Sequence, residues 1–421
     1  MRAAVLFLAL AAAARAAEVP AGPSLTLPEA FAAAKAQSEA LAASQAGVEE
    51  AEQRVRELWG AVQPSVAVQG SEFLQDSMGG GAGVQSTLNR PDRPEAKLTL
   101  AQPLFSGFRE FLALKAARTR RDASAADLER ASSLLYRDVA RAFHDLLSVQ
   151  HELATRRATV VLTAERVKDL EARAKLGRSR ASEVLQAKVL QSEAEAQLPD
   201  AAGRERTTHE VLSFLTGLPG PLTPVEAQAA PAPALEDALR RARGRADVRA
   251  RRDDLAGTQF LERAARRERW PTASLGGNYY LKRIGFQEDI KWDVTFLASL
   301  PLYSGGGATA RIAEAGSRTR AAELKLKGAE RLAESEARRS YARLEAELER
   351  GRALASAAEL AERNAKAQAE EYKLGVVTNL DVLGSLTSLQ NVRLELERSR
   401  LEASYLRAEL EAAVGGPEAP R

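Results

Sequence analysis

The chain has 421 residues, of which 28% are charged and only 5% are aromatic, and it contains no cysteine. This composition is typical of long helices or coiled coils, argues against several ordinary globular domains, and excludes disulfides. The 60 lysines and arginines nearly balance the 57 aspartates and glutamates, for a net charge of +3. The two signs are interleaved along the chain, so no basic block indicates a nucleic-acid partner.

The first residues have the pattern of a secretory signal peptide. Arg2 precedes an apolar run from residue 3 to residue 14, and Ala14-Arg15-Ala16 fits a cleavage site between small residues. We therefore expect residues 1–16 to be a signal peptide and the chain to be exported without a lipid anchor on cysteine; a short buried helix is the alternative. No later apolar run is long enough to predict a transmembrane helix.

A helix and two alternating segments open the remaining chain. The helix is expected over 28–60, because the proline at its start suits a first helical turn, where a missing N–H costs nothing. Apolar and polar residues then alternate over 64–73 and over 98–102, where the alternation stops at a proline. A glycine-rich loop joins the two segments, so the pattern predicts a β-hairpin over 62–105.

Long helices follow this hairpin. Residues 107–176 contain no proline, and a helix of that length would measure roughly 105 Å at 1.5 Å per residue. Apolar residues recur every seven positions along it from Val139 to Val167, which predicts a supercoiled seam against its neighbours. A tight turn and a helix over 180–215 complete a first structural repeat, residues 17–217.

The same order of elements returns about 200 residues later, which predicts a duplicated structural unit. Residues 218–233, rich in proline and alanine, are a predicted connector, and residues 415–421 a tail. The second repeat, residues 234–414, is predicted to contain a helix over 234–269, a β-hairpin over 271–302, a long helix over 307–374 and a helix over 378–413. The matched motifs are Pro103-Leu104-Phe105-Ser106-Gly107 with Pro301-Leu302-Tyr303-Ser304-Gly305, Lys175-Leu176-Gly177 with Lys373-Leu374-Gly375, and Glu183-Val184-Leu185 with Asp381-Val382-Leu383.

The second hairpin has the pattern of membrane-barrel strands. Trp292, Val294 and Phe296 alternate with Asp293 and Thr295, and segments of about ten such residues can cross a bilayer with an aromatic residue at its interface. The alternative is a surface hairpin on a soluble domain. Four strands cannot close a membrane barrel, and an open edge in lipid leaves backbone groups unpaired, so we expect the chain to oligomerise.

These features together resemble the TolC-like outer membrane efflux protein family, from about residue 25 to residue 415. The resemblance rests on the duplicated order of elements and on two longer motifs. They are Leu98-Thr99-Leu100-Ala101-Gln102-Pro103-Leu104-Phe105-Ser106-Gly107 and Tyr372-Lys373-Leu374-Gly375-Val376-Val377-Thr378-Asn379-Leu380-Asp381-Val382-Leu383.

The resemblance implies a mixed, mainly α fold. In it, a homotrimer forms a twelve-stranded transmembrane β-barrel that a periplasmic α-helical barrel continues. It implies a passive outer-membrane channel of a tripartite efflux or type I secretion system, and neither enzyme activity nor a cofactor. The implied partners are a periplasmic adaptor, an inner-membrane pump or ABC transporter, and outer-membrane lipid.

The resemblance also assigns the turns of the two helical hairpins to adaptor docking. The assigned residues are Leu176, Gly177 and Arg178 in one turn, and Leu374, Gly375 and Val376 in the other. From the residues alone, the two glycines are left-handed caps that end the long helices.

Asp381 matches a family position whose acid lines the periplasmic entrance, where three copies would bring like charges together. The alternative is a capping box, because Thr378-Asn379-Leu380-Asp381 has the required spacing, and both roles are compatible. Glu183 is its counterpart in the first repeat and a second candidate for the entrance, through a contact between hairpins. Gly384 stands where some members have a second aspartate, and Val377 offers no polar link to a neighbouring hairpin, so a tightly locked entrance is not predicted.

A periplasmic or secreted coiled-coil scaffold without pore activity is the alternative function. The sequence has no Walker loop, nucleophile elbow or dinucleotide fingerprint. His144 and His151 lie seven residues apart, but no cysteine or carboxylate cluster accompanies them in the sequence to make a metal site. Drugs, metal ions and a secreted protein all stay open as cargo.

Overall fold

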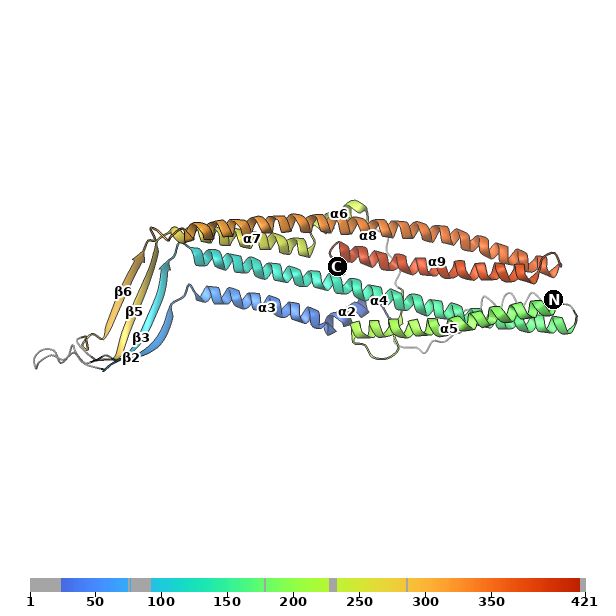
Figure 1. Ribbon diagram of the computed structural model, residues 1–421, viewed down its shortest axis with the longest axis horizontal. Helices are drawn as coiled ribbons and strands as arrows, with labels where there is room; N and C mark the ends of the chain where they lie inside the picture. Colours follow the sequence, from blue (N-terminus) through green and yellow to red (C-terminus); the bar gives the residue numbers. More distant parts are fainter. Residues whose placement is uncertain are drawn as a thin grey trace, which may run out of the picture. The chain divides into compact units, whose positions relative to one another are not determined.

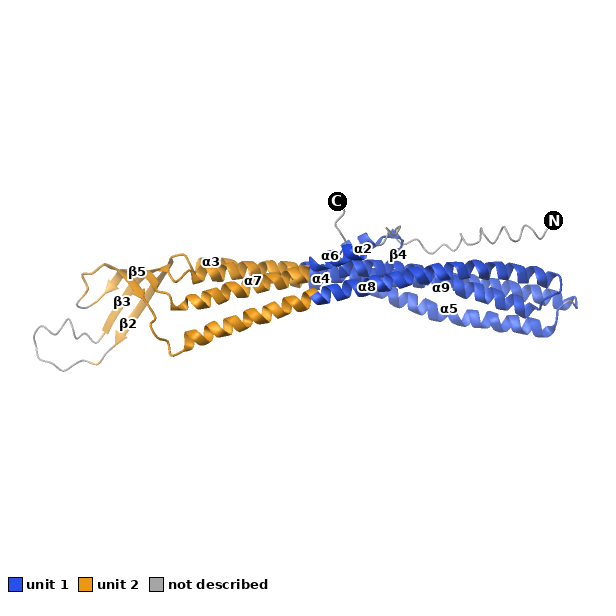
Figure 2. Cartoon of the chain, turned by 90° about the horizontal axis from the view of Figure 1, so that it is seen from above, with its two compact units in different colours: residues 1–42, 129–245, 331–421 blue, residues 43–128, 246–330 orange. Residues whose placement is uncertain are grey.

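The computed structural model describes residues 24–74, 76, 92–177, 179–226, 233–284 and 287–416. They form two compact units (Figure 2). Unit 1 comprises the described residues of the ranges Met1–Ala42, Glu129–Arg245 and Arg331–Arg421, and unit 2 comprises those of Ala43–Leu128 and Ala246–Glu330. The predicted signal peptide, Arg178, part of the connector and most of the tail lie outside the described residues. Among the described helices, none is both long and apolar enough to span a membrane.

Helices dominate the described chain (Figure 1). The helices are α2 (Leu27–Gln37), α3 (Glu39–Gly60), α4 (Arg109–Lys175), α5 (Ala181–Thr216), α6 (Leu235–Arg243), α7 (Ala246–Arg266), the 3-10 turn η1 (Arg267–Arg269), α8 (Gly307–Lys373) and α9 (Asn379–Ala413). The strands are β1 (Ser24–Leu25), β2 (Ser65–Leu74), β3 (Asp92–Phe105), β4 (Thr223–Pro224), β5 (Thr272–Arg283) and β6 (Trp292–Ser299). The helices α4 and α8 have 67 residues each, and α5 and α9 have 36 and 35.

The single helix predicted over 28–60 is wrong, because the chain breaks at Ser38. This residue has extended backbone angles, φ −71° and ψ 108°. Its N–H donates to the Ala34 carbonyl, which ends α2. Its hydroxyl accepts a 3.3 Å hydrogen bond from the N–H of Leu41. One serine therefore ends α2 and caps the N-terminus of α3, the position at which serine is favoured.

The helix predicted over 234–269 is also interrupted. Gly244 ends α6, and α7 begins at residue 246. The intervening Arg245 is only 2% exposed. Its Nη1 donates to the Glu336 carboxylate at 2.5 Å and to the Ala413 carbonyl at 3.0 Å. A buried guanidinium needs such partners. Arg245 makes these contacts from the break between α6 and α7.

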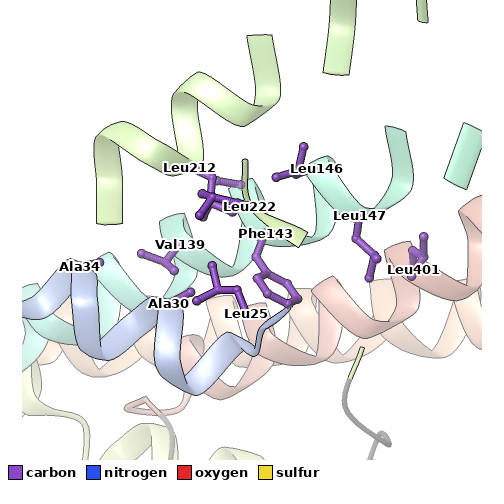
Figure 3. Close-up of a cluster of buried hydrophobic side chains, with 11 residues drawn as sticks. Leu25, Ala30, Ala34, Val139, Phe143, Leu146, Leu147, Leu212, Leu222 and Leu401 are labelled. Atoms are coloured by element: carbon purple, nitrogen blue, oxygen red, sulfur yellow. The ribbon is translucent and has the colours of Figure 1, made fainter. Parts of the chain in front are cut away.

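The main core of unit 1 gathers residues from five separate segments around α4 (Figure 3). Val139, Phe143 and Leu146 share one face of α4 by helical spacing and are at most 1% exposed. Leu25 is held against them because β1 pairs in parallel with β4. The other members of this core are Ala30, Ala34, Ala142, Leu147, Leu212, Leu222 and Leu401. Full burial of each large aliphatic side chain contributes about 1.5–3 kcal/mol.

Unit 2 contains a four-stranded antiparallel sheet in the order β2-β3-β5-β6. The apolar-polar alternation of its second strand stops at Pro103, but β3 continues to Phe105, the end of the hairpin predicted over 62–105. Pro103 lies opposite Ser274, and the register shifts between Pro103 and Phe105. A proline has no N–H for the ladder and is tolerated at such an irregularity.

Candidate functional site: a two-faced sheet and the helical hairpin turns

One face of the sheet in unit 2 is apolar and exposed. The strand register aligns Val68, Leu98, Tyr279 and Trp292 in one row across all four strands. The side chains of this apolar face are Val66, Val68, Leu98, Leu100, Tyr279, Trp292, Val294 and Phe296, all exposed. Trp292, predicted to lie at a membrane interface, is 66% exposed at the first position of β6. Contiguous apolar surface of this kind marks a face that needs a non-aqueous neighbour.

The opposite face of the same sheet is polar. The next row in the register aligns Ala67, Thr99, Asn278 and Asp293. Successive residues of a strand point to opposite faces, so the polar set alternates with the apolar one. The polar face comprises Ser65, Gln69, Ser71, Thr99, Ser274, Asn278, Asp293 and Thr295. The two faces of the sheet thus differ in polarity.

The first predicted turn ends α4 in unit 1. The Gly177 N–H donates to the Ala174 carbonyl at 3.0 Å, and Gly177 has a φ of +71°, which favours glycine. Leu176 is exposed. In the first turn of α5, Glu183 accepts a 2.5 Å hydrogen bond from the Ser179 hydroxyl. This side-chain contact ties the residue before the N-cap to the first turn of α5, and the sequence did not predict it.

The second predicted turn ends α8. The N–H of Gly375 donates to the Tyr372 carbonyl, and the N–H of Val376 donates to the Glu371 carbonyl. With Gly375 at φ +76°, these two bonds form a Schellman motif. Leu374 is 79% exposed and Val376 71%. Both hairpin turns lie at the same end of unit 1 (Figure 2), so their exposed apolar side chains mark one end of that unit.

Asp381 forms the predicted capping box with Thr378. The Thr378 N–H and hydroxyl donate to its Oδ2 at 2.8 and 2.6 Å, and the Asp381 N–H reaches the hydroxyl at 3.4 Å. Hydrogen bonds from the Thr378 hydroxyl and then its N–H lower the pKa of Asp381. The carboxylate therefore stays charged at a lower pH than an ordinary aspartate.

A cluster that the sequence did not predict links α4 to the second hairpin. We call it the Arg166 cluster: Arg166, Asp169, Arg173, Tyr372 and Asn379. Arg166 donates to Asn379 Oδ1 at 2.5 Å, and Asn379 is fully buried. The guanidiniums of Arg166 and Arg173 lie 5.1 and 5.7 Å from the centre of the Tyr372 ring. Asp169 pairs with both arginines at 3.4 and 3.1 Å.

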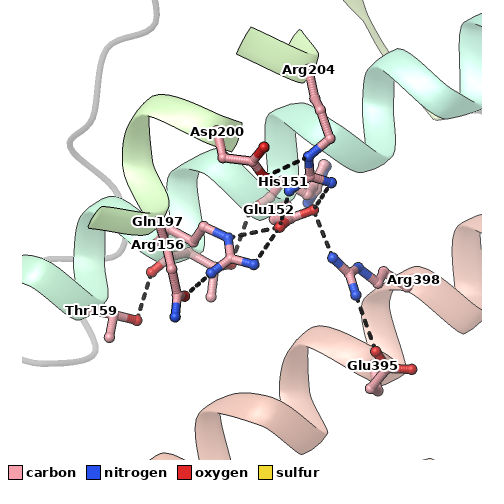
Figure 4. Close-up of polar contacts among 10 residues, drawn as sticks. His151, Glu152, Arg156, Thr159, Gln197, Asp200, Arg204, Glu395 and Arg398 are labelled. Atoms are coloured by element: carbon pink, nitrogen blue, oxygen red, sulfur yellow. Dashed lines mark hydrogen bonds and ion pairs between the residues drawn. The ribbon is translucent and has the colours of Figure 1, made fainter. Parts of the chain in front are cut away.

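A second unpredicted cluster surrounds Glu152 of α4 (Figure 4). This carboxylate is 2% exposed. It accepts hydrogen bonds from Arg156 of the same helix, Arg204 of α5 and Arg398 of α9, at 2.7, 2.7 and 2.8 Å. Burial raises the pKa of Glu152, but the hydrogen bonds from Arg204, Arg398 and Arg156 outweigh it and lower the pKa to about 2. Three helices of unit 1 are thereby joined through one anion.

A groove of about 370 Å³ extends between these two clusters. Arg156 and Gln197 line it beside Glu152, and Arg166 and Asp169 line it near the turns. Its remaining walls are Thr155, Thr159, Leu162, Thr163 and Glu165 of α4, Leu190, Glu193 and Ala194 of α5, and Leu383, Leu386, Thr387, Gln390, Asn391 and Leu394 of α9. The Glu152 cluster thus links α4 to α5 and α9 at one end of the groove, and the Arg166 cluster links α4 to the second hairpin at the other.

The described residues contain no group of three or more histidines or acids that could hold a metal ion. His144 is buried, with Nδ1 2.8 Å from the Ala140 carbonyl. Burial lowers the pKa of His144. Burial therefore favours the neutral form of this imidazole.

Comparisons with known proteins were made on this basis. Residues 31–218 match the family model described as outer membrane efflux protein, and no curated protein sequence matches the chain. Among solved structures, CusC has a TM-score of 0.82 at 17% identity, covering 96% of each chain. VceC of Vibrio cholerae, an outer membrane protein, has a TM-score of 0.76 at 20% identity, covering 93% of this chain and 96% of its own.

MtrE of Neisseria gonorrhoeae, an outer membrane channel, has a TM-score of 0.77 at 20% identity. The match covers 93% of this chain and 89% of MtrE. At these identities, the three solved structures show a shared fold.

Proposed function

We propose that the chain is an outer-membrane channel. The proposal starts from the expected resemblance to the TolC-like outer membrane efflux protein family, which is confirmed by the match over residues 31–218 and by the fold. The chain is a passive exit duct of a tripartite efflux or type I secretion system, exported by its N-terminal signal and not an enzyme. An inner-membrane transporter and a periplasmic adaptor deliver the cargo. Trp292 lies at the membrane interface.

The two-faced sheet carries this proposal. Val68 and Phe296 of the apolar face are 72% and 63% exposed, and no described segment covers them. Lipid is the neighbour that such a face requires, while the polar face suits a water-filled lumen. A water-soluble coiled-coil scaffold would leave the apolar face of strands of about ten residues exposed to water.

The sheet edges support assembly from several copies. In the order β2-β3-β5-β6, the strands β2 and β6 have no further partner among the described strands. Unpaired backbone groups at an edge are not tolerated in hydrocarbon, so each edge must pair with a strand of another copy. A homotrimer would supply twelve strands, continued by a barrel of the long helices in the periplasm.

The exposed turns support docking of an adaptor. Leu176, Leu374 and Val376 present apolar side chains on rigid, glycine-capped turns, and preformed apolar surface lowers the entropic cost of binding. Arg178 completes the docking set by its position in the sequence. Asp381 and Glu183 form the acidic lining of the entrance, and the capping bonds fix the Asp381 carboxylate in its charged form.

Matched arginine substitutions on adjacent residues of β6 test the proposal. Val294→Arg puts a charge on the apolar face and costs about 2–4 kcal/mol in lipid, whereas Thr295→Arg keeps it on the polar face. We expect wild type and Thr295→Arg to purify in detergent as trimers and to give single-channel steps in a planar bilayer. Val294→Arg should fail to insert. A wild-type chain that is soluble without detergent and gives no current would favour the scaffold.

A further inference from the structure

The polar face of the sheet carries a compact charged cluster towards the start of β3 and the end of β5. We call it the Tyr280 cluster: Glu95, Lys97, Tyr280, Arg283 and Asp293. Lys97 and Arg283 pair with the two carboxylate oxygens of Glu95 at 2.9 and 3.5 Å. The Tyr280 hydroxyl donates to Asp293 Oδ2 at 2.6 Å. Every member belongs to unit 2.

A β-bulge brings these side chains to one face. The register shifts between Ala96 and Lys97, so Lys97 lies opposite Tyr280 and Ala96 opposite Lys282, with Leu281 as the extra residue. In a regular register continued from the pair of Lys97 and Tyr280, Glu95 would lie opposite residue 282, and Arg283 would belong to the other face of the sheet. Bulges re-aim side chains in this way.

The side chains of the Tyr280 cluster pack against one another. Tyr280 is 9% exposed, whereas its neighbour Tyr279 on the apolar face is 53% exposed. The Arg283 guanidinium lies 4.2 Å above the centre of the Tyr280 ring, and the Lys97 ammonium lies 5.9 Å from it. The charged side chains therefore form an ordered layer with fixed positions on the polar face.

The cluster is also electrically balanced. Its two cations, Lys97 and Arg283, both pair with Glu95. Asp293 is held instead by neutral donors, the Tyr280 hydroxyl and the Asn278 amide, at 2.6 and 2.8 Å. Two positive and two negative groups give no net charge. Loss of any one of them would leave an unbalanced charge in every copy.

Resting on the proposed channel, we propose that the Tyr280 cluster lines the ion path of the membrane pore as a charge-neutral section. This section passes solutes of either sign and leaves charge discrimination to the acidic entrance around Asp381. Glu95, Lys97, Arg283 and Asp293 are the residues whose opposite charges keep this section neutral. Each copy of the assembly contributes one Tyr280 cluster. A substitution that removes one charge therefore leaves a ring of like charges around the pore.

The test measures the ratio of cation to anion permeability from reversal potentials of single channels. Arg283→Gln should raise the ratio at least about twofold and Asp293→Asn should lower it at least about twofold, because each uncovers a ring of one sign. The matched controls Arg283→Lys and Asp293→Glu keep the charge and should keep the wild-type ratio. Unchanged ratios in Arg283→Gln and Asp293→Asn, with wild-type conductance, would overturn the proposal.

Cysteine labelling tests the same placement without altering the cluster. An introduced cysteine is labelled specifically, because the chain has no native cysteine. Thr99→Cys lies on the polar face and Leu98→Cys on the apolar face of the same strand. A charged thiol reagent added to open channels should reduce the current of Thr99→Cys only. A positive and a negative reagent should react at similar rates. If neither reagent reduces the current of Thr99→Cys channels, the proposal is contradicted. If the wild-type protein gives no channel current at all, the proposed function is contradicted instead.

Discussion

Arg398 of α9 donates a 2.8 Å hydrogen bond to Glu152 of α4, a contact between residues 246 positions apart in the chain. Arg204 of α5 and Arg156 hold the same carboxylate. A buried anion is costly unless it is paired, and here α5 and α9 each supply a cation to Glu152. Glu152 therefore fixes how far α5 and α9 can slide along α4.

Glu152→Gln should strongly destabilise the protein. The substitution keeps the shape of the side chain but leaves three arginines around a neutral amide, and loss of one partner of a buried ion pair costs roughly 3–5 kcal/mol. The matched control is Glu402→Gln, which breaks the more exposed pair between α9 and Arg141 at 3.3 Å and should cost at most about 1 kcal/mol. Unfolding of the detergent-solubilised protein, followed by circular dichroism, measures both. If both substitutions lowered the free energy of unfolding equally, the buried Glu152 would contribute no more to stability than the exposed Glu402.

The stabilisation from Glu152 should depend on pH with a defined sign. Its pKa falls from an ordinary 4.5 to about 2 in the folded chain, so the folded state binds the proton more weakly than the unfolded state. The benefit, roughly 3 kcal/mol, is complete above about pH 4.5 and is lost as the pH falls towards 2. The difference in unfolding free energy between wild type and Glu152→Gln should be constant from pH 7 to about 5 and shrink below. A difference that stays constant down to about pH 2.5 contradicts this assignment.

Two glycines of the second hairpin should respond to alanine in opposite directions. Gly375 has a φ of +76° and Gly384 lies inside α9, and a Cβ at either position meets no atom within 4 Å. Gly375→Ala should therefore cost about 1 kcal/mol from backbone strain alone. Gly384→Ala should stabilise the helix by up to about 1 kcal/mol. Thermal unfolding of both variants checks the signs, and a harmless Gly375→Ala would mean that the turn relaxes into another conformation.

Arg166→Ala should loosen the start of α9. It removes the hydrogen bond to Asn379 and the contact with the Tyr372 ring, which together are worth about 1–3 kcal/mol. Amide hydrogen exchange over residues 379–385 should accelerate by about tenfold or more. Arg393→Ala is the control, because it breaks only an exposed pair with Glu362 at 2.9 Å and should leave this segment unchanged. Unaltered exchange in Arg166→Ala would remove the Arg166 cluster as a restraint on the turn.

Features that depend on neighbouring residues were predictable from the sequence. The glycine at each hairpin turn, the capping box of Thr378 and Asp381, and the alternation of Trp292 to Thr295 all follow from local backbone and side-chain preferences. The structure contains the two caps and the capping box at these residues. Local signals also existed at Ser38 and Gly244, a serine that can cap a helix and a glycine that can end one, where unbroken helices were expected.

The contacts that join distant segments were decided only by the tertiary structure. The chain has 57 acidic residues, and nothing beside Glu152 in the sequence distinguishes it as the one that three arginines surround. Its partners are chosen by how α5 and α9 pack along α4. Likewise, the bulge at Lys97 depends on pairing with β5, some 180 residues away. Local sequence determines periodicity, turns and caps because those energies are local, whereas the partner of a long charged side chain depends on which helices and strands the packed core brings alongside it.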